Sequence, residues 1–312
     1  MMFFSSSVFS LEEVSVSKAN EEAPKTEALK DLCLKTLGSF PGPEDKSPDK
    51  KKNTHTNLNP EPNILAAVCS QMRVLSGCES VEKVPIYHYE KMGSHKSKQK
   101  ILVFSLIHGD ETPAGSVARF WLERLETINP RNSWRVVPVL NPDGLKRKTR
   151  TNANGVDVNR NFPTRDWVSK AVSYWKTEAK QNPRRFPGPT AGSEPETRCA
   201  LKHIEEFKPD LIVSVHTPLK VLDFDGPKVQ PPKFEYLPWK SLGNYPGSLG
   251  RYMWFERKKP VLTMEMKEDL PSSTKPFLEL QDIIGFLVSL EFGQLRSPDK
   301  KTENLPASPV KK

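Results

Sequence analysis

The chain has 312 residues, of which 47 are lysine or arginine and 38 are aspartate or glutamate, so its formal net charge is +9. This length accommodates one large domain of roughly 250 residues with tails, or two smaller domains. The sequence has no run of about 18 apolar residues, so we expect no membrane-spanning helix. Its 16 glycines follow no three-residue period, which excludes a collagen-like protein. The four cysteines are too few for a disulfide-built scaffold of this size.

Much of the positive charge lies in two polar segments. Residues 50–52 are lysines in a stretch rich in proline and aspartate, and four more lysines stand near the end of the sequence, at Lys300, Lys301, Lys311 and Lys312. A nucleic-acid-binding face needs basic residues clustered on one folded surface with aromatic residues between them. The sequence shows no such stripe, so we expect no nucleic-acid partner.

The cysteines give no metal motif. Cys33, Cys69, Cys78 and Cys199 form no Cys-x-x-Cys pair, so a thiolate metal site is not expected. Cys69 and Cys78 could form a local disulfide in an oxidising compartment, and buried reduced thiols fit equally well. The first ten residues are apolar or small but lack the basic start of a secretory signal, because the first lysine is Lys18. The compartment therefore stays open between the periplasm or cell envelope and the cytoplasm.

Composition divides the chain into three parts. Residues 1–60 are poor in core-forming residues and rich in Ser, Glu, Lys and Pro, so we expect a disordered or loosely attached leader. Residues 61–296 have the size of one catalytic domain. Residues 297–312 are polar again and are expected to be a flexible basic tail. No internal repeat is apparent, which excludes a solenoid.

The elements of the central domain begin with a strand. Residues 101–106 (ILVFSL) form a short apolar run of the buried-strand type. A helix is predicted next, because Pro113 suits a first helical turn and apolar residues recur at helical spacing over 114–125. The following strand is 134–140 (WRVVPVL), in which Pro138 indicates a sheet edge or a bulge.

The second half of the domain continues the alternation. Ser193 and Glu196 form a capping-box pattern before a helix that runs to about Phe207. The remaining predicted elements, in chain order, are a strand at 210–215, a helix at 247–257, a strand at 260–266 and a closing helix at 275–294. This alternation predicts an α/β fold with a mixed, mostly parallel central sheet flanked by helices.

Three side chains of metal-ligand type stand at the ends of predicted strands. His108 and Glu111 follow the strand at 101–106 as His-Gly-Asp-Glu, and His216 follows the strand at 210–215. Open α/β sheets bind ligands beyond the carboxyl ends of their strands, so these residues are expected to meet there. Two imidazoles and one carboxylate suit Zn²⁺ and leave a fourth position for water. Taken alone, Glu111 could instead cap the next helix, and His216 could be a packed histidine.

A second polar cluster follows the strand at 134–140. It begins with Asn-Pro-Asp-Gly at 141–144 and continues with Arg147, Arg150, Asn159 and Arg160. Arginine recognises carboxylates through planar, two-pronged contacts, and one arginine could also face a developing oxyanion. The alternative is structural: Asn-Pro-Asp-Gly makes a good turn, and the basic residues could lie in a solvated loop.

Glu265 is a carboxylate inside an apolar strand, among Val261, Leu262, Met264 and Met266. A lone buried charge is costly, so Glu265 must be paired, bound to a ligand or catalytic. A water activated by a metal would need such a base nearby. A structural ion pair is the alternative.

Taken together, these residues resemble the zinc carboxypeptidase family. The order of His-x-x-Glu, Arg, Asn-Arg, His and a late strand Glu matches that family over about residues 84–269. The segments GVDVNRNFP, SEPET at 193–197 and NYPGSLG look most like the bacterial murein-tripeptide-amidase branch. Members of that branch cleave the bond between γ-D-glutamate and diaminopimelate in cell-wall peptides.

The resemblance implies a role for each matching residue. His108, Glu111 and His216 would bind one zinc ion per chain. Glu265 would be the general base and then the proton donor. The expected function is therefore a zinc-dependent carboxypeptidase or amidase that hydrolyses a peptide bond next to a free carboxylate, with a murein peptide as substrate. The alternatives are a deacylase or deglutamylase on the same scaffold and a non-catalytic binding module.

The resemblance also implies substrate contacts. Asn159 and Arg160 would hold the terminal carboxylate of the substrate. Arg150 matches the oxyanion arginine of short-loop members, and Arg147 matches the longer-loop pattern; Arg150 is preferred. The remaining two implied substrate-binding residues are Tyr245, near the place of a mobile tyrosine, and Leu249, at the position that tunes the side-chain pocket.

Overall fold

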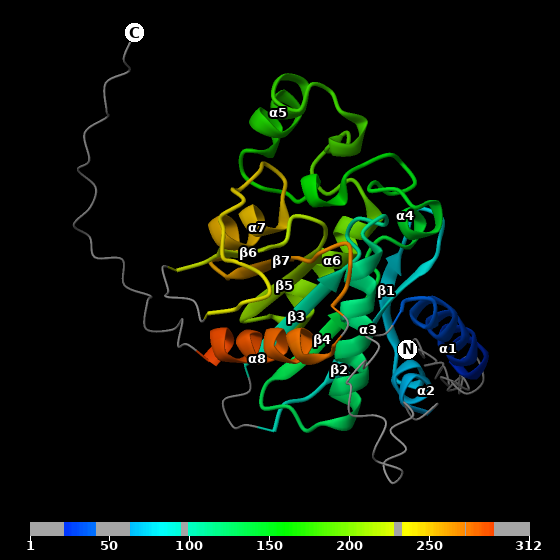
Figure 1. Ribbon diagram of the computed structural model, residues 1–312. Coiled ribbons are helices and arrows are strands. Elements are labelled where there is room, and N and C mark those ends of the chain that lie inside the picture. Colours follow the sequence, from blue (N-terminus) through cyan, green and yellow to red (C-terminus); the bar gives the residue numbers. More distant parts are fainter. Residues whose placement is uncertain (1–21, 42–62, 95–98, 228–232, 272, 290–312) are drawn as a thin grey trace, which may run out of the picture.

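The computed structural model describes residues 22–41, 63–94, 99–227, 233–271 and 273–289 (Figure 1). Within them lies a seven-stranded sheet in the order β1-β2-β4-β3-β5-β7-β6. The strands are β1 Arg73–Glu79, β2 Pro85–Lys91, β3 Lys100–Ser105, β4 Ser133–Val137, β5 Leu211–His216, β6 Val221–Asp225 and β7 Val261–Glu265. The four central strands run parallel, whereas β1, β2 and β6 join antiparallel at the two edges. The predicted mixed, mostly parallel sheet is confirmed.

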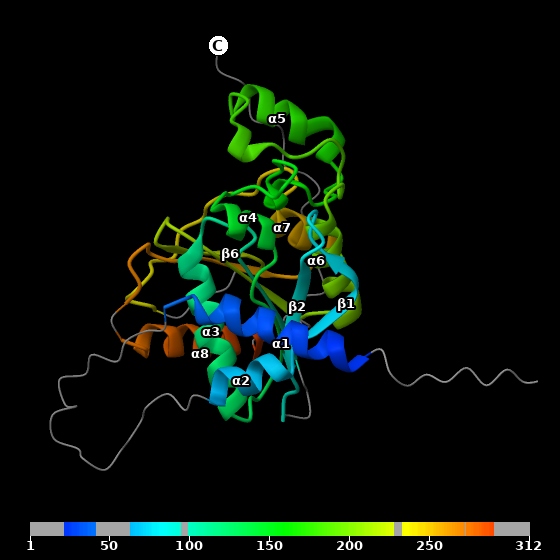
Figure 2. The same cartoon turned by 90° about the vertical axis from the view of Figure 1, so that its right-hand side faces the viewer.

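Helices cover both faces of this sheet (Figures 1 and 2). Residues of one face, such as Ile101 and Val103 of β3, pack against α1 Glu22–Gly38, α2 Asn63–Ser70, α3 Thr112–Thr127 and α8 Lys275–Ser289. Residues of the other face, such as Leu102 and Phe104, pack against α6 Pro195–Phe207, the short α7 Leu249–Arg251 and the π-helical turn Tyr252–Arg257. Buried parallel strands read as continuous apolar runs, which is why these strands were predictable.

The expected leader contains a packed helix, so the prediction of a loosely attached segment is wrong for residues 22–41. Cys33 and Leu37 of α1 are fully buried in the core, and Phe40 is almost so. The Arg119 guanidinium donates a hydrogen bond from Nη1 to the Phe40 carbonyl at 2.7 Å. The segment is polar on average, so the few apolar residues that α1 buries in the core did not stand out in its composition. The rest of that segment and the expected tail at 297–312 lie outside the described residues.

The cysteines pair differently from the sequence prediction. Disulfides join Cys33 to Cys69 and Cys78 to Cys199, so both alternatives left open for Cys69 and Cys78, a bridge between them and buried reduced thiols, are wrong. Cys69 lies in the last turn of α2 and bonds to α1, whereas Cys78 lies on β1 and bonds to Cys199 of α6. The closeness of Cys69 and Cys78 in sequence does not show that their side chains point toward different elements. The two bridges tie the N-terminal elements to the domain.

Two local predictions also fail. The predicted capping box is absent, because the N-cap of α6 is Glu194 and makes no side-chain cap. Glu196 instead accepts hydrogen bonds from Asn152 Nδ2 at 2.8 Å and from the Val81 backbone at 3.1 Å. Pro138 marks no sheet edge, since β4 ends just before it and lies between β2 and β3.

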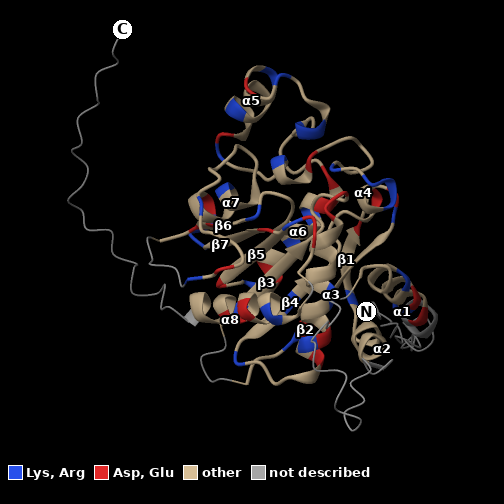
Figure 3. Cartoon of the chain, viewed as in Figure 1, with Lys and Arg blue, Asp and Glu red and all other residues tan. Residues whose placement is uncertain are grey.

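The smaller elements lie beyond the carboxyl ends of the parallel strands. They are α4 Pro142–Arg147, α5 Val172–Thr177 and the single turns Val158–Arg160, Trp167–Ala171 and Pro183–Arg185. Figure 3 shows lysine and arginine interspersed with aspartate and glutamate over most elements in that view. None of the described helices combines the length and apolar character needed to cross a membrane.

Candidate metal centre and active site

The candidate site lies where three parallel strands end. His108 follows β3 after two residues, while His216 and Glu265 are the last residues of β5 and β7. The parallel register pairs His216 directly with Glu265. Neighbouring strands lie about 4.8 Å apart, so the sheet itself places the candidate base beside a candidate metal ligand.

The loop after β3 turns sharply to present its two side chains. Leu106 has a positive φ of 49°, and a side chain at Gly109 would collide with the backbone of Gly144. Glu111 occupies the N-cap position of α3 but makes no side-chain cap there. Its carboxylate contacts the two histidines instead, so the alternative that Glu111 caps the helix is wrong.

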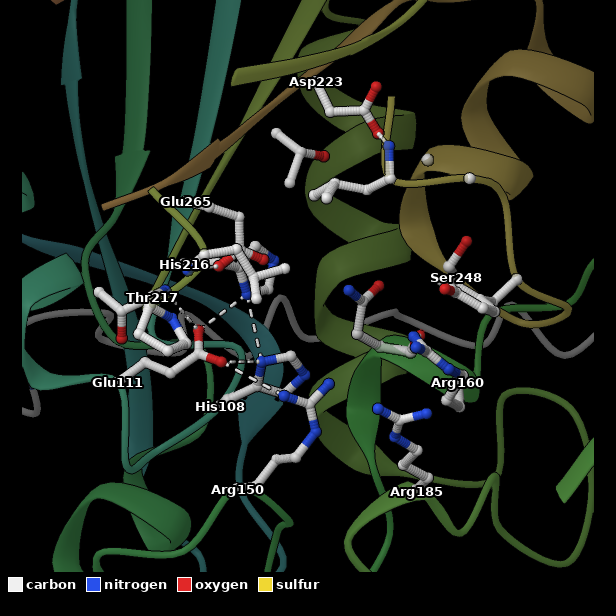
Figure 4. A pocket seen from close by; sticks show the side chains of 18 of the residues that line it. His108, Glu111, Arg150, Arg160, Arg185, His216, Thr217, Asp223, Ser248 and Glu265 are labelled. Atoms are coloured by element: carbon white, nitrogen blue, oxygen red, sulfur yellow. Dashed lines mark hydrogen bonds and ion pairs between the residues drawn. The ribbon is translucent and has the colours of Figure 1, made fainter. Parts of the chain in front are cut away.

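His108, Glu111 and His216 converge on one point (Figure 4). Glu111 Oε1 lies 2.7 Å from His108 Nδ1, and Glu111 Oε2 lies 2.9 Å from His216 Nδ1. The two Nδ1 atoms are 3.1 Å apart. All three residues are at most 7% exposed. These are the atoms and spacings of a small cation site rather than of packed core histidines.

The opposite ring nitrogens of both histidines are already engaged. His108 Nε2 lies 3.1 Å from Asp157 Oδ1, and His216 Nε2 lies 2.8 Å from Ser214 Oγ. With its Nε2 proton donated to Asp157, a neutral His108 directs the lone pair of Nδ1 toward Glu111 and the other histidine. Partners of this kind orient the imidazoles that bind metals.

These residues fit the zinc that the family implies. Zinc–nitrogen bonds of 2.0–2.1 Å place neighbouring tetrahedral ligand atoms about 3.3 Å apart, close to the separations in the trio. Burial raises the pKa of Glu111, but His108 and His216 outweigh it and hold the pKa well below its usual range. A buried carboxylate between two imidazoles needs positive charge beside it, which a metal ion supplies when both rings are neutral. The described residues contain one further group of three metal-ligating side chains, considered below.

Arg150 and Arg147 lie in different surroundings. Arg150 donates from Nε to Asp157 Oδ2 at 3.0 Å and from Nη1 to Glu111 Oε1 at 3.3 Å, beside the trio. Arg147 is exposed and donates from Nη2 to Glu82 Oε1 at 2.5 Å, away from the cavity. The geometry therefore favours Arg150 as the arginine that faces a developing oxyanion.

Arg160 lies across the cavity from the trio (Figure 4). Its Nη1 donates to the Asn159 carbonyl at 2.7 Å, and its guanidinium stacks over the Tyr245 ring at 4.6 Å. Its Nε is buried without a hydrogen-bond partner, and Arg160 forms no ion pair within the described part of the chain. Burial lowers the pKa of Arg160; the nearby Asp157 opposes this effect, and Arg150 and Arg185 add to it. With no ion pair of its own among the described residues, Arg160 can accept an anionic ligand.

A hydrogen bond links the backbone of Leu249 to the side chain of Asn159. The Leu249 amide donates to Asn159 Oδ1 at 2.9 Å, and Asn159 Nδ2 has no partner among the described residues. Asn159 lines the cavity, but the Leu249 side chain is 1% exposed and packs in the second core cluster. Leu249 thus positions Asn159 and does not line the pocket.

Sequence reasoning missed three carboxylates of the site. Asp157 holds both His108 and Arg150, and the fixed spacing GVDVNRN was the available signal. Asp223 and Asp225 of β6 line the far wall of the cavity, whose volume is about 360 Å³. No pattern pointed to them, because β6 itself was not predicted.

The comparisons with known proteins agree with this geometry. Residues 63–225, just over half of the chain, match the zinc carboxypeptidase (Peptidase_M14) family. The chain belongs to the zinc carboxypeptidase family. The resemblance inferred from the spacing of the ligands is thereby confirmed.

Several relatives are murein peptide amidases. The chain is 35% identical over 129 residues to murein peptide amidase A of Escherichia coli K12, covering 41% of this chain and 52% of that protein. The match to the Vibrio campbellii protein of the same name is 28% over 199 residues, covering 60% and 77%. Murein-tripeptide amidase MpaA from Escherichia coli O157 superimposes with a TM-score of 0.52 and 26% identity, covering 70% and 91%. The chain spans about half the length of the E. coli K12 relative it matches in sequence.

Proposed function

We propose that the protein is a zinc-dependent carboxypeptidase or amidase that hydrolyses a peptide bond next to a free carboxylate. One observation carries the proposal: the half-buried Arg160 forms no ion pair with any described residue, and it faces the metal-ligand trio across one cavity. A terminal carboxylate on Arg160 would supply a counter-ion. It would also place the adjacent amide bond toward His108, Glu111 and His216.

The residues around the trio divide the chemical work. Bound zinc would acidify a water and polarise the amide carbonyl. Glu265 accepts a backbone hydrogen bond from Leu219 on Oε2 at 3.3 Å, and its Oε1 has no partner among the described residues. Glu265 Oε1 can therefore take the proton of the attacking water and return it to the leaving nitrogen. Arg150 would stabilise the negative charge that develops on the carbonyl oxygen.

We further propose that the substrate is a cell-wall peptide ending in diaminopimelate. The relatives named above are murein peptide amidases. The wall formed by Asp223 and Asp225 also supports this substrate, because diaminopimelate carries a second ammonium group. Burial and the neighbouring Asp223 raise the pKa of Asp225 to about 6, and a bound ammonium would offset that cost. A side chain at Gly250 would collide with the Asp225 carboxylate, so this glycine keeps the wall open.

Replacing Arg160 by lysine should lower kcat/KM by at least about tenfold, although the charge is kept. Lysine cannot make the planar, two-pronged contact with a carboxylate. The measurement compares a peptide with a free terminus against the same peptide with an amidated terminus. The loss should shrink for the amidated peptide, and an equal loss on both would make Arg160 a structural residue. N-acylated amino acids in the same assay distinguish a deacylase from a peptidase.

Replacing Asp225 by asparagine should raise KM for a peptide ending in diaminopimelate by about tenfold, since one charge-assisted contact is worth roughly 1.5–3 kcal/mol. A peptide ending in an uncharged residue of similar length should show little change. Asp282→Asn, an exposed change on α8, is the matched control. Equal effects on both peptides would contradict an ammonium site at this wall.

A further inference from the structure

We propose that Cys78, Cys199 and His203 form a second metal site, which holds a zinc ion when the two cysteines are reduced. The disulfide between Cys78 and Cys199 is then the metal-free alternative of the same site. This site is separate from the active-site cavity, whose lining includes none of its residues.

The three donor atoms already lie together. One ligand atom from each of Cys78, Cys199 and His203 lies within 4.8 Å of the other two, and all three residues are at most 2% exposed. Cys199 and His203 are four positions apart on α6, so both side chains project from the same face of the helix. Cys78 reaches them from β1. Two thiolates and one imidazole are three of the four ligands of a Cys₂His₂ zinc site.

The histidine beside the cysteines has no hydrogen bonds. Both ring nitrogens of His203 are buried without a partner in the described part of the chain, and so is Nδ1 of His88. The two rings lie 4.9 Å apart between centroids. Buried polar side chains are nearly always hydrogen-bonded. A metal ion on His203 would engage one of these ring nitrogens, and the adjacent His88 is an imidazole that a fourth ligand position could recruit.

The other disulfide provides an internal contrast. Cys33 and Cys69 lie in the apolar core cluster with residues such as Leu37 and Val68. The described residues contain no metal-ligating group of three that includes either cysteine. Reduction of Cys33–Cys69 should therefore create two buried thiols and no metal site.

Exchange between the two forms balances chemically. A dithiol reductant transfers two electrons and two protons to the disulfide, giving two thiols while the reductant becomes a cyclic disulfide. Zinc binding then releases the two thiol protons, because cysteine binds zinc as thiolate. Both forms cross-link β1 to α6. Since Glu196 at the start of α6 holds Asn152, either cross-link steadies the loop that carries Arg150 and Asp157.

Cobalt(II) absorption spectra of the full chain test this proposal. The oxidised protein should bind cobalt at His108, Glu111 and His216 without any sulfur-to-metal band. After reduction with a dithiol and removal of the reductant without air, a thiolate-to-cobalt charge-transfer band should appear, because cysteine is then the only source of thiolate. Bound metal should also protect Cys78 and Cys199 from alkylation, as read by mass spectrometry of the peptides.

Two variants locate the band. His203→Phe keeps the ring volume and should weaken cobalt affinity at the new site at least about a hundredfold, more than loss of an orienting partner does. A Cys33→Ser, Cys69→Ser double variant should keep the band. If either variant fails to fold, the alkylation pattern of the reduced wild-type chain decides alone.

Three outcomes would overturn the proposal. They are a reduced, folded chain without the charge-transfer band, equal alkylation of Cys78 and Cys199 with and without metal, or loss of fold on reduction in the presence of cobalt. The experiment is independent of the proposed hydrolase activity, because no readout uses turnover.

Discussion

Replacing Glu265 by glutamine should reduce turnover at least about a hundredfold while the protein folds and binds zinc as before. Glutamine keeps the shape of the side chain and its hydrogen bond from the Leu219 amide, but it cannot accept the water proton. The parallel register places Glu265 beside His216, and both residues line the same cavity. Steady-state kcat measures the loss of turnover, while the zinc content and the circular dichroism spectrum show whether the variant still binds metal and folds.

Glu268→Gln is the matched control for this change. Glu268 lies three residues further along and is exposed, so its replacement should leave kcat unchanged. Wild-type turnover by the Glu265→Gln variant would show that Glu265 is not the general base. Glu265 is half-buried and lines the cavity, so its replacement is not expected to unfold the domain. A large drop in melting temperature would instead show that Glu265 forms a structural ion pair.

Replacing His216 by alanine should abolish detectable hydrolysis and lower zinc affinity more than any change to an orienting residue. Only His108 and Glu111 would remain as protein ligands. Asp157→Asn provides a graded comparison, because it keeps all three ligands and disturbs only the orientation of His108. Loss of such a partner typically costs about 10–100-fold in metal affinity or activity.

Isothermal titration with zinc and melting temperatures separate these effects. His216→Ala should still fold, because a domain of this size does not depend on zinc for its core. If His216→Ala retained wild-type zinc affinity, the metal would have to lie elsewhere. If Asp157→Asn matched His216→Ala in both affinity and turnover, Asp157 would act as more than an orienting residue.

The sequence reveals the central strands of the fold far better than its edges. β3, β4, β5 and β7 are apolar on both faces, so each stands out as a continuous run. β2, with the sequence PIYHYEK, is mostly buried but mixes polar and apolar residues, and β6 is only five residues long. Antiparallel strands of this kind, at or next to the sheet edges, owe their strand conformation more to pairing with neighbouring strands than to their own pattern.

The convergence of the candidate metal ligands could be predicted, because the strand ends impose their meeting point. The choice between Arg150 and Arg147 could not be made with certainty from spacing, since it depends on how the loop after α4 folds over Asp157. The position of Leu249 predicted a pocket residue, but its side chain turned into the core. The sequence did not single out His203, because Cys78 comes from β1, far from α6 in sequence, and Cys199 and His203 alone form no recognisable metal motif.

Zinc titration of the metal-free, oxidised chain, followed by hydrolysis of a murein tripeptide, tests the central claim most directly. Turnover should be absent without metal, rise in proportion to added zinc and level off at about one zinc per chain, as expected for an open three-ligand site. Hydrolysis by the metal-free chain at the zinc-loaded rate would contradict the account.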